Sequence, residues 1–407
     1  MDTERPKVVL NQSKEQSLLR KHPWVFSGAI KKIIADNEPA EGEIVDVVDS
    51  KENFLATGHF QTGSIAVRLF SFIEGETDQK FWNSKIQNAY NYRKQIGLID
   101  DPNTNVYRLL YAEGDGMPGM IIDFYNGTAV LQSHSTGMHL AKEHIVKALK
   151  DIYKDKLHAV YDKSEESMPK LGKEKTRLPD GQVKNGYLFG KADTNEVVEN
   201  GHKFFVDWET GQKTGFFIDQ RDNRQLLAKY SKEKKILNTF CYSGGFSVYA
   251  AVAGAELVHS VDSSKKAIEL TDKNINLNAG NFNGVALESF TADTFDFLHK
   301  KHNQYDVIIL DPPAFAKNRN ATHNAINGYK RLNTEAIKQI KPGGMLFTFS
   351  CSQVISPAMF HGAIRASAII AGRNARIVHQ LSHPADHPIS IFHPEGEYLK
   401  GLVVQVE

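Results

Sequence analysis

The chain has 407 residues, 41% of them hydrophobic and 24% charged, which is enough for two or three globular domains. Its formal net charge of +1 excludes nucleic-acid binding driven by bulk charge, so only a local basic patch would serve such binding. Two cysteines exclude a disulfide framework, and without a signal-peptide core or a membrane-length apolar run we expect a cytoplasmic protein with no membrane partner.

Residues 1–75 are predicted to form a small β-rich domain. Apolar and polar side chains alternate along residues 65–70, which is the period of a strand. Residues 44–48 and 54–60 are two further strand-like runs with polar residues between them. We therefore expect a small β-rich module at this end of the chain.

A cationic and aromatic stretch precedes these strands. Arg20, Lys21 and His22 are followed closely by Trp24 and Phe26. Cations beside aromatic rings can bind phosphates and stack a base. Taken alone, the stretch is better explained as a charged turn next to core aromatics.

Residues 76–190 are predicted to form a central α/β domain. Helical spacing, an Asn-Gly turn and a dense run of Lys and Glu mark its parts. The expected elements are a helix over 78–98 capped by Asp78, a hairpin at Asn126 and Gly127, a helix over 140–152, a strand over 159–161 and an exposed loop over 163–186.

Residues 191–407 are predicted to form a doubly wound α/β domain. Asn200 and Gly201 indicate another hairpin, and residues 216–224 are predicted to run from a strand into a helix. From Lys235 onward, strand-like and helix-like runs alternate to the end, which is typical of a mostly parallel sheet with helices on both faces.

The first three strands of this domain are predicted to end in groups that suit a nucleoside. The first is followed by Ser243, Gly244 and Gly245, and paired glycines let a ligand approach a helix N-terminus closely. Asp262 ends the second strand and can accept both hydroxyls of a ribose. Asp293 ends the third and is placed to meet an adenine edge. Each of these alone is equally well a turn or cap; in this order they favour a nucleoside-containing cofactor.

A fourth strand over residues 307–310 ends abruptly at Asp311, Pro312 and Pro313. Two prolines stiffen the turn and hold the carboxylate at the carboxyl end of a buried strand, although a simple turn aspartate is the ordinary alternative. The glycine turn lacks the Gly-x-Gly-x-x-Gly spacing of dinucleotide folds. The Asp-Pro-Pro turn resembles the class I methyltransferase motif, so we favour S-adenosylmethionine (SAM) over NAD.

A helix is predicted over residues 329–340, and the fifth strand, over residues 345–350, ends at Cys351. This places a thiol opposite Asp311 on the same edge. Free cysteines are usually buried apolar residues, and we leave Cys241 in that class. A thiolate that adds to carbon 6 of a pyrimidine makes carbon 5 a nucleophile for the SAM methyl group. Asp311 would then hydrogen-bond the cytosine ring, while the base that removes the carbon 5 proton stays unassigned.

Short matches along the whole chain resemble the bacterial 23S rRNA cytosine-5 methyltransferase family RlmI. They cover residues 22–28, 116–119, 213–215, 219–222, 242–246, 311–313, 328–330, 348–352, 385–388, 394–396 and 398–401. The resemblance implies an N-terminal PUA domain for RNA, a central α/β domain and a C-terminal Rossmann-like methyltransferase. It also implies that Cys351 is the nucleophile, with 23S rRNA or a large-subunit precursor as partner and a homodimer as one option.

The resemblance and the strand-end pattern together give a set of site residues. Cys351 and Asp311 are the expected catalytic pair, and no metal is part of the site. The residues expected at SAM are Gln220, Asn238, Phe240, Ser243, Gly244, Gly245, Asp262, Asp293 and Asp311, and those expected at the substrate are Pro312, Pro313, Phe315, Tyr329, Lys330, Arg20 and Lys21.

Two departures and two alternatives accompany this interpretation. Ala314 stands where the family carries lysine, and the Asp-Pro-Pro turn lacks the second cysteine that often assists product release in the broader class. Methylation of a base nitrogen is one alternative, because Asp-Pro-Pro turns followed by an aromatic residue, here Phe315, also serve amino groups. A non-catalytic RNA-binding assembly factor is the other.

Overall fold

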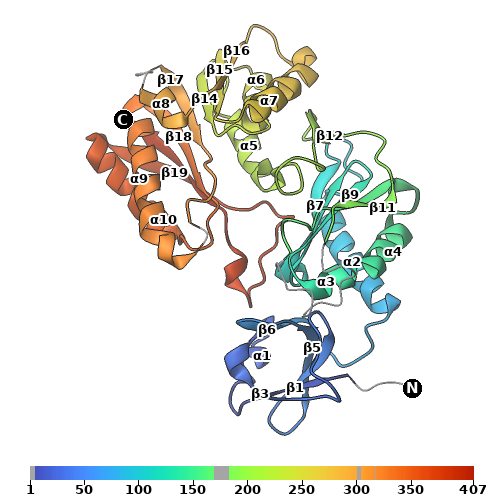
Figure 1. Cartoon of the computed structure of the whole chain (residues 1–407). Coiled ribbons are helices and arrows are strands. Elements are labelled where there is room, and N and C mark those ends of the chain that lie inside the picture. The colour runs from blue at the N-terminus through green and yellow to red at the C-terminus, as the bar shows by residue number, and fades with distance from the viewer. Residues whose placement is uncertain (1–4, 169–182, 300–303, 317) are drawn as a thin grey trace. The chain divides into compact units, whose positions relative to one another are not determined.

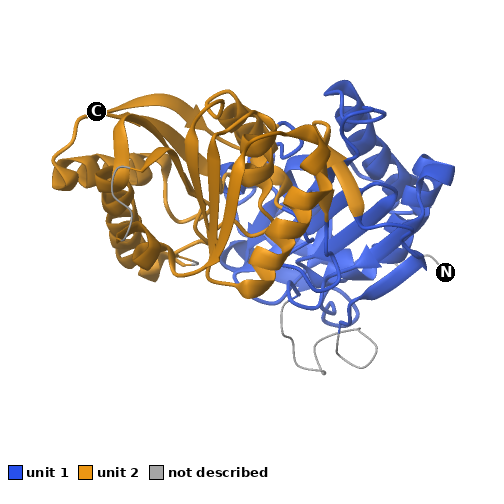
Figure 2. Cartoon of the chain, turned by 90° about the horizontal axis from the view of Figure 1, so that it is seen from above, with its two compact units in different colours: residues 1–195, 206–216, 385–396 blue, residues 196–205, 217–384, 397–407 orange. Residues whose placement is uncertain are grey.

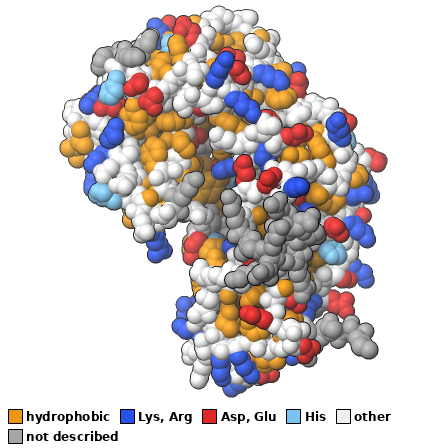
Figure 3. Space-filling view, viewed as in Figure 1, with side chains coloured by type: hydrophobic (Ala, Val, Ile, Leu, Met, Phe, Trp, Pro, Cys, Tyr) orange, Lys and Arg blue, Asp and Glu red, His pale blue; other side chains and the backbone are white. Residues whose placement is uncertain are grey.

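The computed structural model describes residues 5–168, 183–299, 304–316 and 318–407, and it divides them into two compact units (Figure 2). Unit 1 comprises residues 1–195, 206–216 and 385–396, and unit 2 comprises 196–205, 217–384 and 397–407. In these described ranges, no helix is long and apolar enough to cross a membrane. On the face drawn in Figure 3, Lys and Arg side chains are interspersed with Asp and Glu, as the net charge of +1 suggests.

Unit 1 begins with a six-stranded sheet, part of which is labelled in Figure 1. Its strand order is β2-β6-β5-β4-β1-β3. Its elements are β1 (Lys7–Leu10), α1 (Gln16–Leu19), β2 (Trp24–Phe26), β3 (Ile30–Ile34), β4 (Ile44–Val48), β5 (Phe54–Phe60) and β6 (Ile65–Ser71). The three strands predicted from alternation are present as β4, β5 and β6. Val45, Val47, Val67 and Leu69 are buried between them and form part of one apolar core.

The second sheet of unit 1 has the order β11-β10-β9-β8-β7. Its elements are α2 (Gln79–Gln95), β7 (Val106–Tyr111), β8 (Met120–Tyr125), β9 (Thr128–Ser133), α3 (Thr136–Leu140), α4 (Lys142–Tyr153), β10 (Ala159–Asp162) and β11 (Gly186–Gly190). The Asp78 carboxylate accepts from the Phe81 amide at 3.0 Å and caps α2 as predicted. Asn126 and Gly127 both have positive φ and join β8 to β9, as an Asn-Gly hairpin requires.

A segment distant in sequence, residues 385–396, completes unit 1. The Asp386 carboxylate accepts from the Arg108 amide at 2.9 Å, and the Asp386 carbonyl accepts from the Arg93 guanidinium at 2.8 Å. At its other end, the Tyr111 hydroxyl donates to the Gly396 carbonyl at 2.8 Å. We call residues 385–396 the strap, since its two ends are tied to β7 and α2.

Unit 2 is built on a seven-stranded sheet in the order β16-β15-β14-β17-β18-β20-β19. Its elements are β12 (Glu196–Glu199), β13 (His202–Phe205), α5 (Arg221–Ala228), β14 (Lys235–Thr239), α6 (Gly245–Val252), β15 (Leu257–Asp262), α7 (Lys265–Leu277), β16 (Ala286–Thr291), α8 (Thr294–His299), β17 (Tyr305–Leu310), α9 (Thr322–Gln339), β18 (Ile340–Ser350), α10 (Pro357–Ala371), β19 (Ala375–Leu381) and β20 (Lys400–Val406). Strands β14 to β18 are parallel, and β20 is antiparallel to both neighbours. The predicted doubly wound fold is confirmed.

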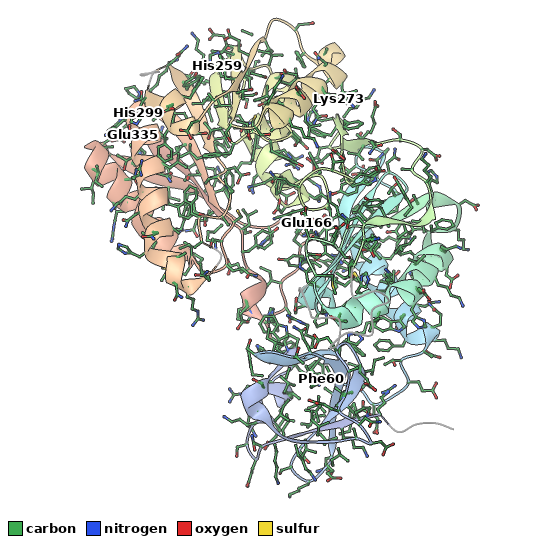
Figure 4. The ribbon with its side chains drawn as sticks, in the orientation of Figure 1. Phe60, Glu166, His259, Lys273, His299 and Glu335 are labelled. Atoms are coloured by element: carbon green, nitrogen blue, oxygen red, sulfur yellow. The ribbon has the colours of Figure 1, made fainter. Side chains whose placement is uncertain are left out.

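Two apolar clusters cover the two faces of this sheet, which explains the continuous apolar run of β17. Ile308 and Leu310 pack in the cluster that includes residues of α8, α9 and α10, whereas Val307 and Ile309 pack in the cluster with α5 and α6. The His299 side chain of α8 lies beside Glu335 of α9 (Figure 4), with 3.3 Å between Nδ1 and Oε2. Parallel strands buried on both faces need no polar side of their own.

Three sequence-based expectations need correction or restriction. The strand predicted to begin at Phe216 is wrong, because residues 218–220 form a 3-10 turn that leads directly into α5. Helix α9 begins at Thr322, earlier than the predicted helix over residues 329–340. The exposed loop predicted over residues 163–186 lies largely outside the described residues, which exclude 169–182.

Candidate functional site

Five parallel strands bring their carboxyl ends to one edge of the unit 2 sheet. Their ends carry the glycine turn after β14, Asp262 on β15, Asp293 after β16, Asp311 after β17 and Cys351 after β18. The order of the sheet reverses between β14 and β17, which neighbour each other although β15 and β16 intervene in sequence. Open α/β sheets bind ligands at the carboxyl edge of such a reversal.

The turn between β14 and α6 has an unusual backbone. Phe240 and Tyr242 have φ values of 53° and 48°, and Gly244 has a φ of 71°. Left-handed conformations at non-glycine residues are costly and concentrate where function requires them. Helix α7 holds the turn in place, because Thr271 Oγ1 donates to the Tyr242 carbonyl at 3.1 Å and Asn274 Nδ2 donates to the Ser243 carbonyl at 2.8 Å.

Two carboxylates flank this turn. Asp262 is half-buried and accepts from the Tyr242 amide at 3.1 Å and the Ser264 amide at 2.9 Å. Asp293 is exposed and caps α8 by accepting from the Phe295 amide at 2.8 Å. Both carboxylates therefore make local turn or cap hydrogen bonds, and both lie at the carboxyl edge of the sheet.

Two other predicted cofactor residues lie on β14 and at its end. Asn238 is buried, and its Nδ2 donates to Ser247 Oγ at 2.9 Å within the layer between β14 and α6. Phe240 is half-buried in the strained turn. Contact of either residue with a cofactor stays a prediction.

Asp311 is oriented by a chain of amide side chains. Gln220 Nε2 donates to Asp311 Oδ2 at 3.1 Å, and Gln220 Oε1 accepts from Asn223 Nδ2 at 2.6 Å. Gln220 and Asn223 are both buried at the start of α5. Asn223 thus fixes which end of the Gln220 amide faces the carboxylate. Sequence reasoning singled out Gln220 but missed Asn223, whose only signal was its position next to the matched residues 219–222.

The two thiols have different surroundings. Cys351 is half-buried, and its Sγ lies 3.7 Å from the Pro312 carbonyl oxygen of the Asp-Pro-Pro turn. Cys241 is buried with its Sγ 3.4 Å from Thr271 Oγ1, and burial raises the pKa of the Cys241 thiol to about 12. Cys241 is thus an inert interior residue, as expected, and Cys351 lies at the ligand edge.

Further contacts join the loop after β18 to the Asp-Pro-Pro turn. Ser352 Oγ donates to the Ala316 carbonyl at 2.6 Å, and Ser350 Oγ donates to the Tyr329 hydroxyl at 2.9 Å. The Tyr329 ring lies 4.6 Å from the Phe315 ring, and burial raises the pKa of Tyr329 to about 12. Cys351 and Asp311 are therefore held in one packed unit.

The remaining predicted substrate residues lie in different environments. Pro312 is buried, Pro313 is exposed, and Lys330 on α9 is half-buried. Arg20 and Lys21 are exposed in unit 1, where Lys21 Nζ lies 4.7 Å from the centre of the Phe72 ring. Contact of these residues, or of the buried Tyr329, with substrate stays a prediction.

The residues at this edge fit a positively charged nucleoside donor. The glycine turn opens onto the N-terminus of α6, and the flanking carboxylates Asp262 and Asp293 suit hydroxyl and amino groups. Among the residues that the structure describes, no group of three or more His, Cys, Asp or Glu side chains is arranged to hold a metal ion. The edge therefore combines a glycine turn with two flanking carboxylates, an oriented carboxylate and a thiol.

Comparison with family models identifies two regions of the chain. Residues 174–391 match the model of S-adenosylmethionine-dependent methyltransferases, and residues 8–72 match that of PUA-like domains. Ribosomal RNA large subunit methyltransferase I of Tolumonas auensis is 38% identical over 406 residues, which cover 98% of each chain. The protein of the same name from an Enterobacter species is 37% identical over 405 residues, covering 98% of this chain and 99% of its own.

Solved structures share the fold at lower identity. A structure assigned as a SAM-dependent methyltransferase from Streptococcus mutans has a TM-score of 0.79 and 21% identity, covering 98% of this chain and 99% of its own. A structure of an assigned methyltransferase in complex with SAH has a TM-score of 0.80 and 22% identity with the same coverage. At these identities the likeness concerns the fold.

Proposed function

We propose that this chain, which belongs to the ribosomal RNA large subunit methyltransferase I family, transfers a methyl group from SAM to carbon 5 of a cytosine in 23S rRNA. Its methyltransferase domain is SAM-dependent, and its N-terminal domain is PUA-like. The domain limits that we propose are 1–75 for the PUA domain, 76–190 for the central domain and 191–407 for the methyltransferase domain.

The observation that carries the proposal is the pairing of a thiol with an oriented carboxylate at neighbouring strand ends. Cys351 Sγ lies 3.7 Å from the Pro312 carbonyl, next to Asp311, whose carboxylate accepts from Gln220. Methylation at a base nitrogen needs no thiol, since the nitrogen has its own lone pair. Carbon 5 of cytosine is a poor nucleophile and requires prior addition at carbon 6.

The reaction begins when the Cys351 thiolate forms a bond to carbon 6 of cytosine. This addition breaks the carbon 5–carbon 6 double bond and moves its electron pair to carbon 5, in conjugation with the ring nitrogen. Carbon 5 would then form a bond to the methyl group that SAM supplies on its sulfonium, while the bond from that methyl group to sulfur breaks and S-adenosylhomocysteine is the leaving group. A base removes the proton from carbon 5, the bond from sulfur to carbon 6 breaks, and the double bond and the thiolate are restored. The ring gains one methyl group and loses one proton.

Asp311 and Gln220 stabilise the ring during addition. Addition at carbon 6 pushes electron density onto the ring nitrogen and favours its protonated form. The Asp311 carboxylate would accept hydrogen bonds from that protonated nitrogen and from the exocyclic amine, which stabilises the adduct. The amide chain from Asn223 through Gln220 holds the carboxylate ready, so little reorganisation is needed at the moment of reaction. The exposed cations Arg20 and Lys21 of the PUA-like domain are proposed to contact RNA phosphates.

A covalent trap tests the proposed nucleophile. A 23S rRNA transcript made with 5-fluorocytidine should form a denaturant-stable complex with the protein in the presence of SAM, because fluorine at carbon 5 blocks the final elimination. Cys351→Ala should form no complex and no methylated product while its SAM affinity stays within about threefold of wild type. Cys241→Ala is the matched control and should still form the complex.

The other outcomes separate the alternatives. Methylation by Cys351→Ala at the wild-type rate would favour transfer to a base nitrogen, and mapping the methylated nucleotide by mass spectrometry in cells with and without this protein would identify the atom. A protein that binds the transcript but not SAM would instead be an RNA-binding assembly factor.

A further inference from the structure

Lys400 is a buried cation at the first position of β20. Lys400 is 5% exposed, and on β20 it pairs with Ser350, the last residue of β18 before Cys351. Lysine is rarely buried unless its ammonium group has partners. The buried ammonium group of Lys400 must therefore have partners in the surrounding part of unit 2.

The ammonium group of Lys400 ties down the loop that carries the thiol. Nζ donates to the Ser352 carbonyl and to the Ile355 carbonyl, each at 2.6 Å. Ser352 follows Cys351 directly and donates in turn to Ala316 at 2.6 Å. One side chain thus links the start of β20 to both ends of the segment from Ser352 to Ile355.

Among the described residues, charged and titratable groups near the thiol include Asp311, Tyr329 and Lys400. Asp311 at the end of β17 contributes a negative charge, which disfavours a thiolate, and Tyr329 on α9 is neutral because burial raises its pKa to about 12. Lys400 on β20 contributes a positive charge. Burial lowers the pKa of Lys400, while Glu397 and Cys351 favour its charged form. The attraction between Lys400 and Cys351 is mutual.

We propose that Lys400 is a positioning residue of the methyl-transfer site: its ammonium group holds the Cys351 loop against β20 and stabilises the Cys351 thiolate. This inference rests on the proposed function, since it gives the thiolate a catalytic use. Two physical effects combine in it. The hydrogen bonds fix where the sulfur lies, and the charge increases the fraction of thiolate present near neutral pH.

Three substitutions separate the hydrogen bonds from the charge. Lys400→Met removes both, Lys400→Gln keeps a donor without the charge, and Lys400→Arg keeps both. Lys163 provides the matched control, because it is also buried and its Nζ also donates to two backbone carbonyls, Trp208 and Gly211, but in unit 1. Lys163→Met therefore reports the general effect of losing a buried lysine tether.

The measurement is the rate at which iodoacetamide alkylates Cys351 as a function of pH, quantified on the Cys351 peptide by mass spectrometry. Lys400→Met and Lys400→Gln should shift the midpoint upward by about one pH unit, while Lys400→Arg and Lys163→Met keep it in place. Single-turnover methyl transfer at pH 7 should fall roughly tenfold in the first two variants and recover as the pH rises. SAM affinity should not change.

A wild-type midpoint in Lys400→Gln would overturn the proposal, and this variant decides the matter even if Lys400→Met does not fold. The alkylation midpoint depends on no assumption about catalysis. If Cys351→Ala were active and the midpoint still shifted, the proposed function would fail while the interaction of Lys400 with the thiol would stand. If Cys351→Ala were inactive and the midpoint did not shift, only the present inference would fail.

Discussion

At the residue scale, Asp262 and Asp311 are both strand-end carboxylates, but their neighbours differ. Asp262 accepts from two backbone amides, those of Tyr242 and Ser264, and lies beside the glycine turn. Asp311 accepts from the Gln220 side chain and lies beside the Cys351 loop. The first environment suits binding of a nucleoside, and the second suits stabilisation of a reacting ring.

This difference predicts a separation of binding from chemistry. Asp262→Asn should weaken SAM binding about tenfold, because a charge-assisted hydrogen bond to the cofactor becomes a neutral one, while the rate at saturating SAM changes little. Asp311→Asn should lower the single-turnover rate roughly 10²–10³-fold even at saturating SAM. Isothermal titration and rapid-quench kinetics measure the two quantities. Equal losses of affinity in both variants, with unchanged saturated rates, would contradict the assignment.

At the element scale, the hairpin of β12 and β13 is bonded to the helices that support the glycine turn after β14. The Glu199 carboxylate accepts from Arg224 on α5 at 2.8 and 2.7 Å and from the Tyr249 hydroxyl on α6 at 2.9 Å. Asn274 Oδ1 on α7 accepts from the Phe205 amide at 2.7 Å. The same α7 residue donates to the glycine turn, so hairpin and turn share one support.

Glu199→Gln should therefore destabilise unit 2. Removing one partner of a fully buried ion pair leaves the Arg224 charge uncompensated, at a cost of about 3–5 kcal/mol in the free energy of unfolding. Urea unfolding followed by far-ultraviolet circular dichroism measures this cost. Glu196→Gln, an exposed change on the same hairpin, should alter the free energy by less than about 0.5 kcal/mol. Equal stabilities for the two variants would show that the Glu199 network is dispensable.

The sequence predicted those parts of the fold whose pattern lies within a short segment of the chain. The strand ends were predictable because apolar runs such as that of β17 stop at proline, glycine or aspartate. The predicted start of α9 was too late, because His323, Asn324 and Gly328 interrupt the apolar pattern in the first turns of this helix. Phe216 and Phe217 resembled a strand through side-chain character, although the backbone turns there.

The parts of the site that were missed depend on contacts between residues distant in sequence. Lys400 acts on carbonyls of Ser352 and Ile355, and no pattern within 398–401 indicates this direction. Asn223 donates to Gln220 Oε1, and this contact is apparent only in the folded structure. The residue types at the strand ends predicted the reactive groups of the edge. The residues that hold those groups in place became apparent only from the structure.

At the scale of the whole molecule, a buried histidine makes the stability of unit 1 dependent on pH. His59 on β5 is 3% exposed and packs beside Phe70 and Trp82, with its ring centre 4.7 Å and 6.2 Å from theirs. Burial lowers the pKa of His59 to about 3. Below the ordinary value of 6.5 the unfolded chain binds a proton that the folded chain does not, so stability is lost as the pH falls from 6.5 toward 3.

Lowering the pH from 7 to 5 should therefore cost about 2 kcal/mol in the free energy of unfolding through His59 alone. Trp24, Trp82 and Trp208, the three tryptophans of the chain, all belong to unit 1, so indole fluorescence during urea unfolding reports on this unit. His59→Phe keeps an aromatic ring without a titrating group and should reduce the loss between pH 7 and pH 5 by that amount. An identical loss in wild type and His59→Phe would exclude this histidine as the cause.

The strap makes the two units inseparable as stretches of polypeptide. The chain leaves unit 2 after residue 384, contributes residues 385–396 to unit 1, and returns to supply β20 with Lys400 at its head. Any fragment of the chain that keeps both β18 and β20 therefore also carries the strap, whose packing partners lie in unit 1. A fragment that begins at β12 would leave the strap without Arg93, Arg108 and Tyr111, the residues that hold it in unit 1.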